Sequence, residues 1–107
     1  MVDINVRVID KTKEFLRQLN TLGIRIQSAY LFGSYAKGTY GNWSDIDVAV
    51  VSPDISEDRL EERIRLTKLA SKIDSRIEPV PFSPSSFVDE DPLVWEIKRV
   101  GIRIDTL

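Results

Sequence analysis

The chain has 107 residues, a length that suits one domain with one hydrophobic core. Hydrophobic residues make up 42% of it and charged residues 30%, a mixture typical of globular proteins and unlike disordered or fibrous chains. The formal net charge of −2 lacks the basic excess of a general nucleic-acid binder, so broad binding to phosphate backbones is disfavoured. Because the sequence contains neither Cys nor His, it excludes disulfides, thiol catalysis, Ser-His triads and nearly all zinc and haem sites.

The ends of the sequence carry no recognisable targeting segment. The first residues lack the basic start and apolar run of a signal peptide. The longest apolar run, Val48–Val51, is far shorter than the roughly 20 residues that a membrane span needs. We therefore expect a cytoplasmic protein that does not enter the membrane.

Hydrophobic periodicity predicts alternating helices and strands in the first half of the chain. The predicted elements are a helix over Val6–Leu22 closed by Gly23, a strand over Ile24–Phe32, a helical turn over Ser34–Lys37, a loop over 38–44 and a strand over Asp45–Ser52. The last of these strands is expected at the centre of the sheet, because Val48–Val51 is apolar on both of its faces.

The second half continues the alternation. It predicts a helix over Ser56–Lys72, a strand over Asp74–Phe82, one helical turn over Pro84–Phe87, a helix from Asp91-Pro92 to about Val100 capped by Gly101, and a short strand over Ile102–Ile104. Ser56 is the expected N-cap of the first helix, on which Leu60, Ile64, Thr67 and Ala70 share a face. Two prolines, Pro79 and Pro81, place their strand at an edge or irregular end of the sheet. The order predicts one α/β (α+β) domain over residues 1–107, with a small mixed sheet flanked by helices.

One stretch concentrates residues suited to phosphate chemistry. Gly33 ends a predicted strand, and Ser34 opens a helical turn whose free amides suit an anion. Asp45 and Asp47 stand at i and i+2 on the next strand, so their side chains share a face with Cα atoms about 6.5–7 Å apart. Such carboxylates repel one another unless cations lie between them, and without His or Cys the natural cations are Mg²⁺ or Mn²⁺. Each motif alone is typical of an ordinary turn or strand end, whereas the combination is far more specific.

The combination resembles a known signature. Gly33-Ser34-Tyr35-Ala36-Lys37-Gly38 followed by Ser44-Asp45-Ile46-Asp47 resembles that of the DNA polymerase β-like nucleotidyltransferase superfamily. The short chain resembles its minimal nucleotidyltransferases, the MNT proteins often encoded beside a HEPN-domain partner. The resemblance implies that Gly33 and Ser34 hold the β- and γ-phosphates of a nucleoside triphosphate, and that Asp45 and Asp47 bind divalent metal ions. Lys37 either steadies the triphosphate or lies on the surface, while Ser44 shapes the loop and Tyr35 and Ala36 pack.

The family usually carries a third carboxylate on a neighbouring strand. Asp74 and Glu78 are the candidates here, and they lie about 13 Å apart along a strand, so both cannot reach one metal ion. We favour Glu78 as the third metal-binding and catalytic carboxylate, because its Ile-Glu-Pro context resembles the family. A solvated carboxylate on an edge strand is the alternative interpretation of Glu78.

The implied reaction is metal-dependent transfer of a nucleoside monophosphate, AMP from ATP, to a hydroxyl group of a protein partner. The resemblance suggests the antitoxin of a HEPN toxin–antitoxin pair, with the acceptor surface supplied by a partner or by a second copy in a homo-oligomer. The alternative is a non-catalytic module that binds nucleotide or neutralises a partner by contact. Glu78 in the place of the usual Asp motivates that alternative.

Other conspicuous residues have ordinary interpretations. Trp43 either stacks on a nucleobase or anchors its loop, and Trp95 is expected to pack in the core or against a partner. A cluster of basic residues on the helix Ser56–Lys72 is most simply a solvated face: Arg59, Arg63, Arg65 and Lys68.

Overall fold

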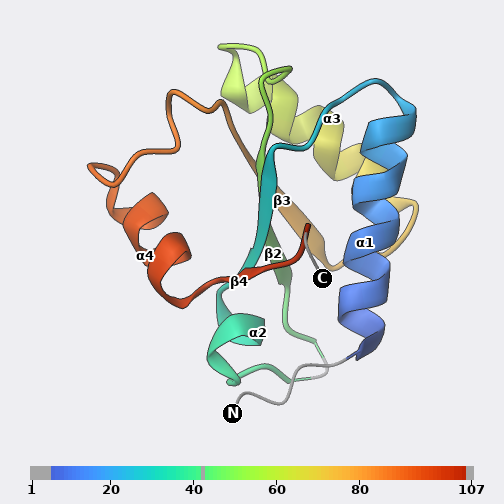
Figure 1. The fold of residues 1–107 in the computed structure, drawn as a ribbon. Helices are drawn as coiled ribbons and strands as arrows, with labels where there is room; N and C mark the ends of the chain where they lie inside the picture. Colours follow the sequence, from blue (N-terminus) through green and yellow to red (C-terminus); the bar gives the residue numbers. More distant parts are fainter. Residues whose placement is uncertain (1–5, 42, 106–107) are drawn as a thin grey trace.

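The computed structural model describes residues 6–41 and 43–105 (Figure 1). The elements follow one another as α1 (Val6–Thr21), β1 (Ser28–Phe32), α2 (Ser34–Lys37), β2 (Ile46–Val51), α3 (Arg59–Ser71), β3 (Ile77–Phe82), α4 (Pro92–Val100) and β4 (Ile102–Arg103). The predicted alternation of helix and strand is confirmed. In the part of the chain that the structure describes, no helix combines the length and the apolar character needed to cross a bilayer.

The sheet is mixed and has four strands in the order β3-β2-β1-β4. β1 pairs antiparallel with β2 and β4, and β2 pairs parallel with β3. This order confirms the central place of β2 and the edge position of β3. The amides of Ile46 and Ser52 donate to the carbonyl oxygens of Arg76 and Phe82 at 2.8 and 3.0 Å, so the even-numbered residues of β3 bond to β2. Pro79 and Pro81 therefore stand where an N–H would point away from the sheet, and they cost no ladder bond.

The two faces of the sheet are covered by different helices (Figure 1). α1 and α3 cover one face, where Phe15, Leu19 and Leu66 pack against alternate residues of β1 and β2. α4 covers the other face, where Val94 and Ile97 pack on Ala49, Val51 and Phe82. Because side chains alternate along a strand, Asp47 lies on the α4 face, two residues before Ala49 at the start of β2.

Two strands begin later in the structure than the sequence predicts. β1 starts at Ser28 rather than Ile24, because Arg25 is held outside the ladder by its backbone amide and guanidinium, which donate to the Asp54 carboxylate at 2.9–3.0 Å. β3 starts at Ile77 rather than Asp74, because the Asp74 carboxylate accepts from the Arg76 amide at 2.9 Å and forms a turn. Side chains that bond to backbone amides thus shorten both strands.

The prediction for α3 was right about the helix and wrong about its details. Asp58, not Ser56, is the N-cap, and its carboxylate accepts from the Glu61 amide at 3.0 Å. The buried residues of α3 are Glu62, Leu66 and Ala70. Of the face predicted from the sequence, only Ala70 is buried, whereas Leu60 and Ile64 point to solvent.

Smaller predictions at the ends of other elements also need correction. Leu22 lies beyond α1 and is exposed, although Gly23 closes the helix with a positive φ as predicted. The segment Pro84–Phe87 is a hydrogen-bonded turn rather than a helix, with the Phe87 amide donating to the Ser83 carbonyl oxygen at 3.1 Å.

Candidate active site

The turn after β1 requires glycine. Gly33 has φ 70° and ψ −145°, a conformation that residues with a Cβ rarely adopt. A Cβ built on Gly33 would overlap the Asp47 carboxylate, chiefly Oδ2. The backbone of the Gly-Ser turn therefore lies directly against the side chain of the second predicted metal ligand.

The short helix α2 holds Ser34 next to this contact. Gly38 ends α2 in the left-handed conformation, and its amide and that of Thr39 both donate to the Ser34 carbonyl oxygen. Tyr35 and Ala36 are buried, which confirms their predicted packing role. The Tyr35 ring stacks on Tyr40 with centroids 4.4 Å apart. Ser34 is half-exposed, and the stacked rings of Tyr35 and Tyr40 hold the short helix on which it lies.

The acidic residues meet at the start of β2 and β3. Asp47 is paired in register with Phe32 of β1 on one side and with Glu78 of β3 on the other. Neighbouring strands lie about 4.8 Å apart, so Asp47 and Glu78 are adjacent on one face of the sheet. The exposed Asp45 directly precedes β2.

This crowding changes the titration of Asp47. Burial of its half-buried carboxyl group, the negative charge of Glu78 and then that of Asp45 raise its pKa from 3.8 to about 6. The positive charge of Arg63 on α3 opposes that rise. Within residues 6–41 and 43–105, no donor hydrogen-bonds to the Asp47 carboxylate, so nothing but Arg63 offsets the repulsion.

The donor set suits an oxygen-preferring divalent cation. Carboxylates that repel one another and accept no hydrogen bond favour a bound cation, and Mg²⁺ needs only one or two of them together with substrate phosphates. Among the described residues, no three acidic side chains are arranged to hold one ion together. A pair of carboxylates that includes Asp47 therefore fits such a cation better than a complete protein cage does.

Asp74, the alternative third carboxylate, is occupied elsewhere. Its Oδ2 lies 2.8 Å from Nη2 of Arg76, and its Oδ1 accepts from Nε at 3.1 Å. The Arg76 guanidinium holds the pKa of Asp74 below its ordinary value. Nη1 of Arg76 also donates to the Tyr35 hydroxyl at 3.3 Å, so this pair supports the packing behind α2.

Lys37 projects from α2 toward α4. Its Nζ lies 3.0 Å from Oε1 of Glu96, and both side chains are half exposed. Lys37, which was predicted to bind phosphate, is therefore paired with the Glu96 carboxylate in this structure. The sequence reasoning missed both Glu96 and Arg63, because the contacts that bring them to the site join distant parts of the chain and leave no local pattern.

Three further predictions can be compared with the structure. The Ser44 hydroxyl accepts from the Gly41 amide at 2.8 Å, which confirms that Ser44 shapes the loop. Trp43 is 92% exposed, so its anchoring role is wrong and only the stacking interpretation stays open. Trp95 is 49% exposed with the Arg99 guanidinium 4.9 Å from its ring centroid, so it does not pack in the core.

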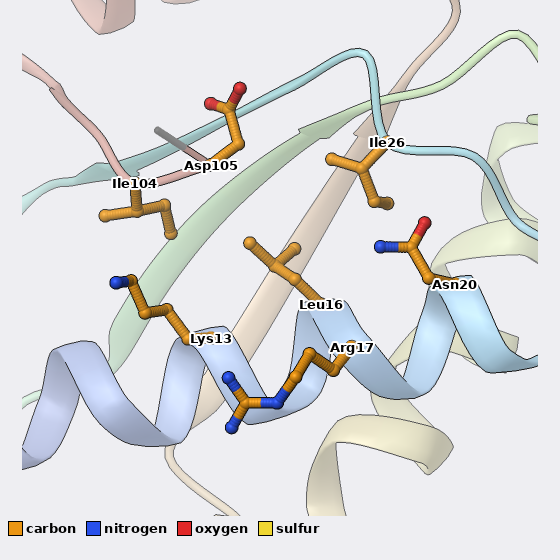
Figure 2. Close-up of a pocket in the computed structure, with 7 residues that line it drawn as sticks. All are labelled: Lys13, Leu16, Arg17, Asn20, Ile26, Ile104 and Asp105. Atoms are coloured by element: carbon orange, nitrogen blue, oxygen red, sulfur yellow. The ribbon is translucent and has the colours of Figure 1, made fainter. Parts of the chain in front are cut away.

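A hollow of about 300 Å³ lies apart from Asp47 and Glu78, between α1 and the segment of Ile104 and Asp105 (Figure 2). The residues that line it are Lys13, Leu16, Arg17, Asn20, Ile26, Ile104 and Asp105. Its carboxylate, Asp105, already accepts from the Ala29 amide at 2.9 Å and from Arg103 at 3.0 Å. This hollow contains none of the predicted site residues.

Comparison with known sequences places the chain in a family. A family model described as a nucleotidyltransferase domain matches residues 9–99. A candidate protein adenylyltransferase of Methanocaldococcus jannaschii is 33% identical over 93 residues, covering 79% of this chain and 92% of its own length. The protein adenylyltransferase MntA of Shewanella oneidensis is 41% identical over 76 residues, covering 71% of this chain and 54% of its own length.

Solved structures show the same fold. A toxin–antitoxin crystallised with AMP-PNP superposes with a TM-score of 0.65 at 33% identity, covering 90% of this chain and 71% of that chain. A mutant MntA-HpeT toxin–antitoxin gives a TM-score of 0.64 at 30% identity, with the same coverage of both chains. A candidate nucleotidyltransferase of Sulfolobus solfataricus gives 0.63 at 20% identity, covering 92% and 79%, and this likeness shows the fold alone.

Proposed function

Because the chain belongs to the nucleotidyltransferase domain family, we propose that it transfers AMP from ATP to a hydroxyl group of a protein partner. One observation carries the proposal. The Gly33 backbone packs against the Asp47 carboxylate while Glu78 stands in register beside it, so the Gly-Ser turn and an acidic pair share one face. The similarity to proteins named as protein adenylyltransferases supports a protein acceptor.

Each residue has a defined part in this reaction. Ser34 and the backbone at Gly33 would bind the β- and γ-phosphates, with Lys37 as a further cation. Asp47, paired with Asp45 or with Glu78, would hold each Mg²⁺ or Mn²⁺ ion, which when bound neutralises phosphate charge and orients the triphosphate. The acceptor oxygen forms a bond to the α-phosphorus, the bond from that phosphorus to pyrophosphate breaks, and the hydroxyl proton passes to solvent. Positioning and charge neutralisation supply most of the catalysis in such displacements, so a site without His suffices.

We further propose that the protein acts in the cytoplasm as the antitoxin of a HEPN-domain toxin. Similarity to toxin–antitoxin structures supports a toxin partner. The acceptor surface would be supplied by the partner or by a second copy of the chain.

Labelled nucleotide tests the proposal. The co-purified complex is incubated with Mg²⁺ and ATP labelled at the α-phosphate, and the labelled protein is identified by electrophoresis and mass spectrometry. We expect label on the partner, none with Asp45→Asn plus Asp47→Asn, and normal labelling with Asp89→Asn, whose carboxylate binds Lys98 elsewhere. Equal labelling by the double variant would refute the assigned site.

A non-catalytic partner-neutralising module is the second candidate. It is favoured by the absence, among the described residues, of three acidic side chains arranged around one ion. Neutralisation of the toxin in cells separates the two functions. If the Asp45→Asn plus Asp47→Asn variant still neutralises the toxin, contact is the activity; if it fails while still binding the partner, transfer is the activity.

A further inference from the structure

The outer face of α3 carries an unexplained apolar ridge. Leu60 is 72% exposed and Ile64 is 49% exposed, one turn apart on the helix. They point outward because Leu66 and Ala70 take the side that packs on the sheet. Sequence periodicity had suggested that this face packs, and the structure leaves it uncovered.

Adjoining hollows run along this ridge. One, of about 410 Å³, is lined by Glu61, Ile64, Arg65, Lys68, Leu69 and Lys72. The next, of about 450 Å³, shares Ile64 and Lys68 with it and adds Leu60, Arg63 and Thr67. A third, of about 210 Å³, shares Leu60 and Arg63 and continues to Arg59, Val80 and Pro81 on β3. Together these residues form one track from the end of α3 to the edge strand, here called the α3 track.

The β3 end of the α3 track lies two residues along the strand from Glu78. Val80 and Glu78 lie on the same face of β3, because they are two residues apart on a strand. Arg63, which lines two of the hollows, is close enough to Asp47 for their charges to interact. A chain that lies along the α3 track and continues past Val80 would therefore approach Glu78 and its register partner Asp47.

The charge of the track differs from that of the molecule. The whole chain has a formal net charge of −2, yet Glu61 is the only acidic residue that lines these hollows. Their basic residues are Arg59, Arg63, Arg65, Lys68 and Lys72. Cations on both flanks of an apolar ridge complement a segment whose apolar side chains are flanked by carboxylates.

We propose that the α3 track docks the acceptor segment of the partner, an amphipathic polypeptide with acidic flanks, and leads its hydroxyl to Asp47 and Glu78. The inference rests on the proposed function, since it names the chemistry of the acceptor for that reaction. A polypeptide fits better than RNA, because phosphate binding uses the cations but leaves Leu60 and Ile64 without a partner.

Direct binding tests the docking surface without ATP or metal. The probe is a fluorescent helical peptide with leucines one turn apart, glutamates on both flanks and one tyrosine, and its counterpart has lysines in place of the glutamates. Fluorescence anisotropy should show binding of the glutamate peptide alone. Ile64→Gln should weaken that binding by about tenfold, as expected for a central apolar contact. Trp95→Gln on α4 is the matched control, because Trp95 and Ile64 are equally exposed at 49%.

A charge reversal gives a second prediction. The Arg63→Glu plus Lys68→Glu variant should no longer bind the glutamate peptide and should bind the lysine peptide instead. Equal binding of both peptides to the wild type, no binding of either, or an unchanged affinity in Ile64→Gln would overturn the proposal. So would an RNA oligonucleotide that displaces the peptide and binds Ile64→Gln normally, or a wild-type dimer that Ile64→Gln converts to a monomer.

The failure of docking is distinguishable from the failure of the proposed reaction. If the glutamate peptide binds at Ile64 but no partner is labelled with AMP, the reaction is wrong and the docking surface stands. If the partner is labelled equally by the wild type and by Ile64→Gln, the reaction stands and the docking surface is wrong.

Discussion

Replacing Asp47 by Asn should make the metal-free protein more stable at neutral pH. The carboxyl group of Asp47 has its pKa raised from 3.8 to about 6, so folding favours its protonated form. Ionisation of Asp47 therefore lowers the free energy of unfolding. This loss is absent below about pH 4, grows between about pH 4 and 6, and is complete above that range. An amide of the same shape carries no charge and escapes this cost.

The size of the effect follows from the shift. Roughly two pKa units correspond to about 3 kcal/mol, and because solvent reaches about half of the side chain we expect about 1–2 kcal/mol. For a chain of 107 residues this raises the melting temperature by roughly 4–9 °C. Millimolar Mg²⁺ should stabilise the wild type and reduce the difference, because a bound cation relieves the repulsion that the substitution removes.

Thermal denaturation followed by circular dichroism at pH 4 and pH 7.5 measures both effects. Asp54→Asn is the control of opposite sign: Arg25 holds the pKa of Asp54 down to about 2, so that substitution should lower the melting temperature at pH 7.5. The reasoning fails if Asp47→Asn melts below the wild type at pH 7.5 without metal, or if its advantage persists undiminished at pH 4.

Further variants probe the turn and the cation beside it. Gly33→Ala should lose roughly 2 kcal/mol or more in chemical denaturation, because its φ is positive and the new Cβ overlaps the Asp47 carboxylate. Ser34→Ala should weaken Mg-ATP binding several-fold in calorimetry with an unchanged melting temperature, since the Ser34 hydroxyl is proposed to bind the triphosphate. Glu96→Gln should tighten Mg-ATP binding by roughly two- to fivefold, because it releases Lys37 from an exposed ion pair. Asp89→Asn, which breaks another α4 ion pair, should leave that affinity unchanged.

Much of the fold could be predicted because its elements have clear periodicity. The apolar residues of α1 and α4 recur at helical spacing. In β2, Asp47 is followed by the unbroken apolar run Val48–Val51. The predicted strand boundary was wrong where a distant side chain accepts a hydrogen bond from a backbone amide, as Asp54 does from Arg25. The prediction of the buried face of α3 was wrong, because the helix carries apolar residues on more than one of its sides. Their spacing alone does not decide whether Ile64 or Leu66 is buried.

The site divides in the same way between local and non-local information. Gly33, Ser34, Asp45 and Asp47 are grouped by a short stretch of sequence, so their proximity was predictable. The pairing of Asp47 with Glu78 depends on the parallel register of β2 and β3, which no local pattern specifies. Arg63 and Glu96 reach the site only through the packing of α3 and α4, and nothing in their surroundings in the sequence distinguishes them from solvated charges.

The choice between Glu78 and Asp74 as third carboxylate gives a final prediction, in which the two variants should behave oppositely. Glu78→Gln should lower the pKa of Asp47 toward its ordinary value, because it removes one of the charges that raise it, and should weaken Mn²⁺ binding without lowering the melting temperature. Asp74→Asn should leave both the Asp47 titration and Mn²⁺ affinity unchanged and lower the melting temperature, because Arg76 loses its partner in the turn before β3.

Carbon NMR of the Asp47 carboxyl group and Mn²⁺ titration by electron paramagnetic resonance measure these effects independently of any enzymatic assay. The reverse pattern would place Asp74 in the metal site, and its ion pair with Arg76 would then have to open when the cation binds. That opening would also release the Tyr35 hydroxyl from Arg76, so a changed environment of the Tyr35 ring on adding Mg²⁺ would accompany it. With Glu78 as the ligand, the Asp74–Arg76–Tyr35 contacts persist and the ring is unaffected, because Glu78 takes no part in those contacts.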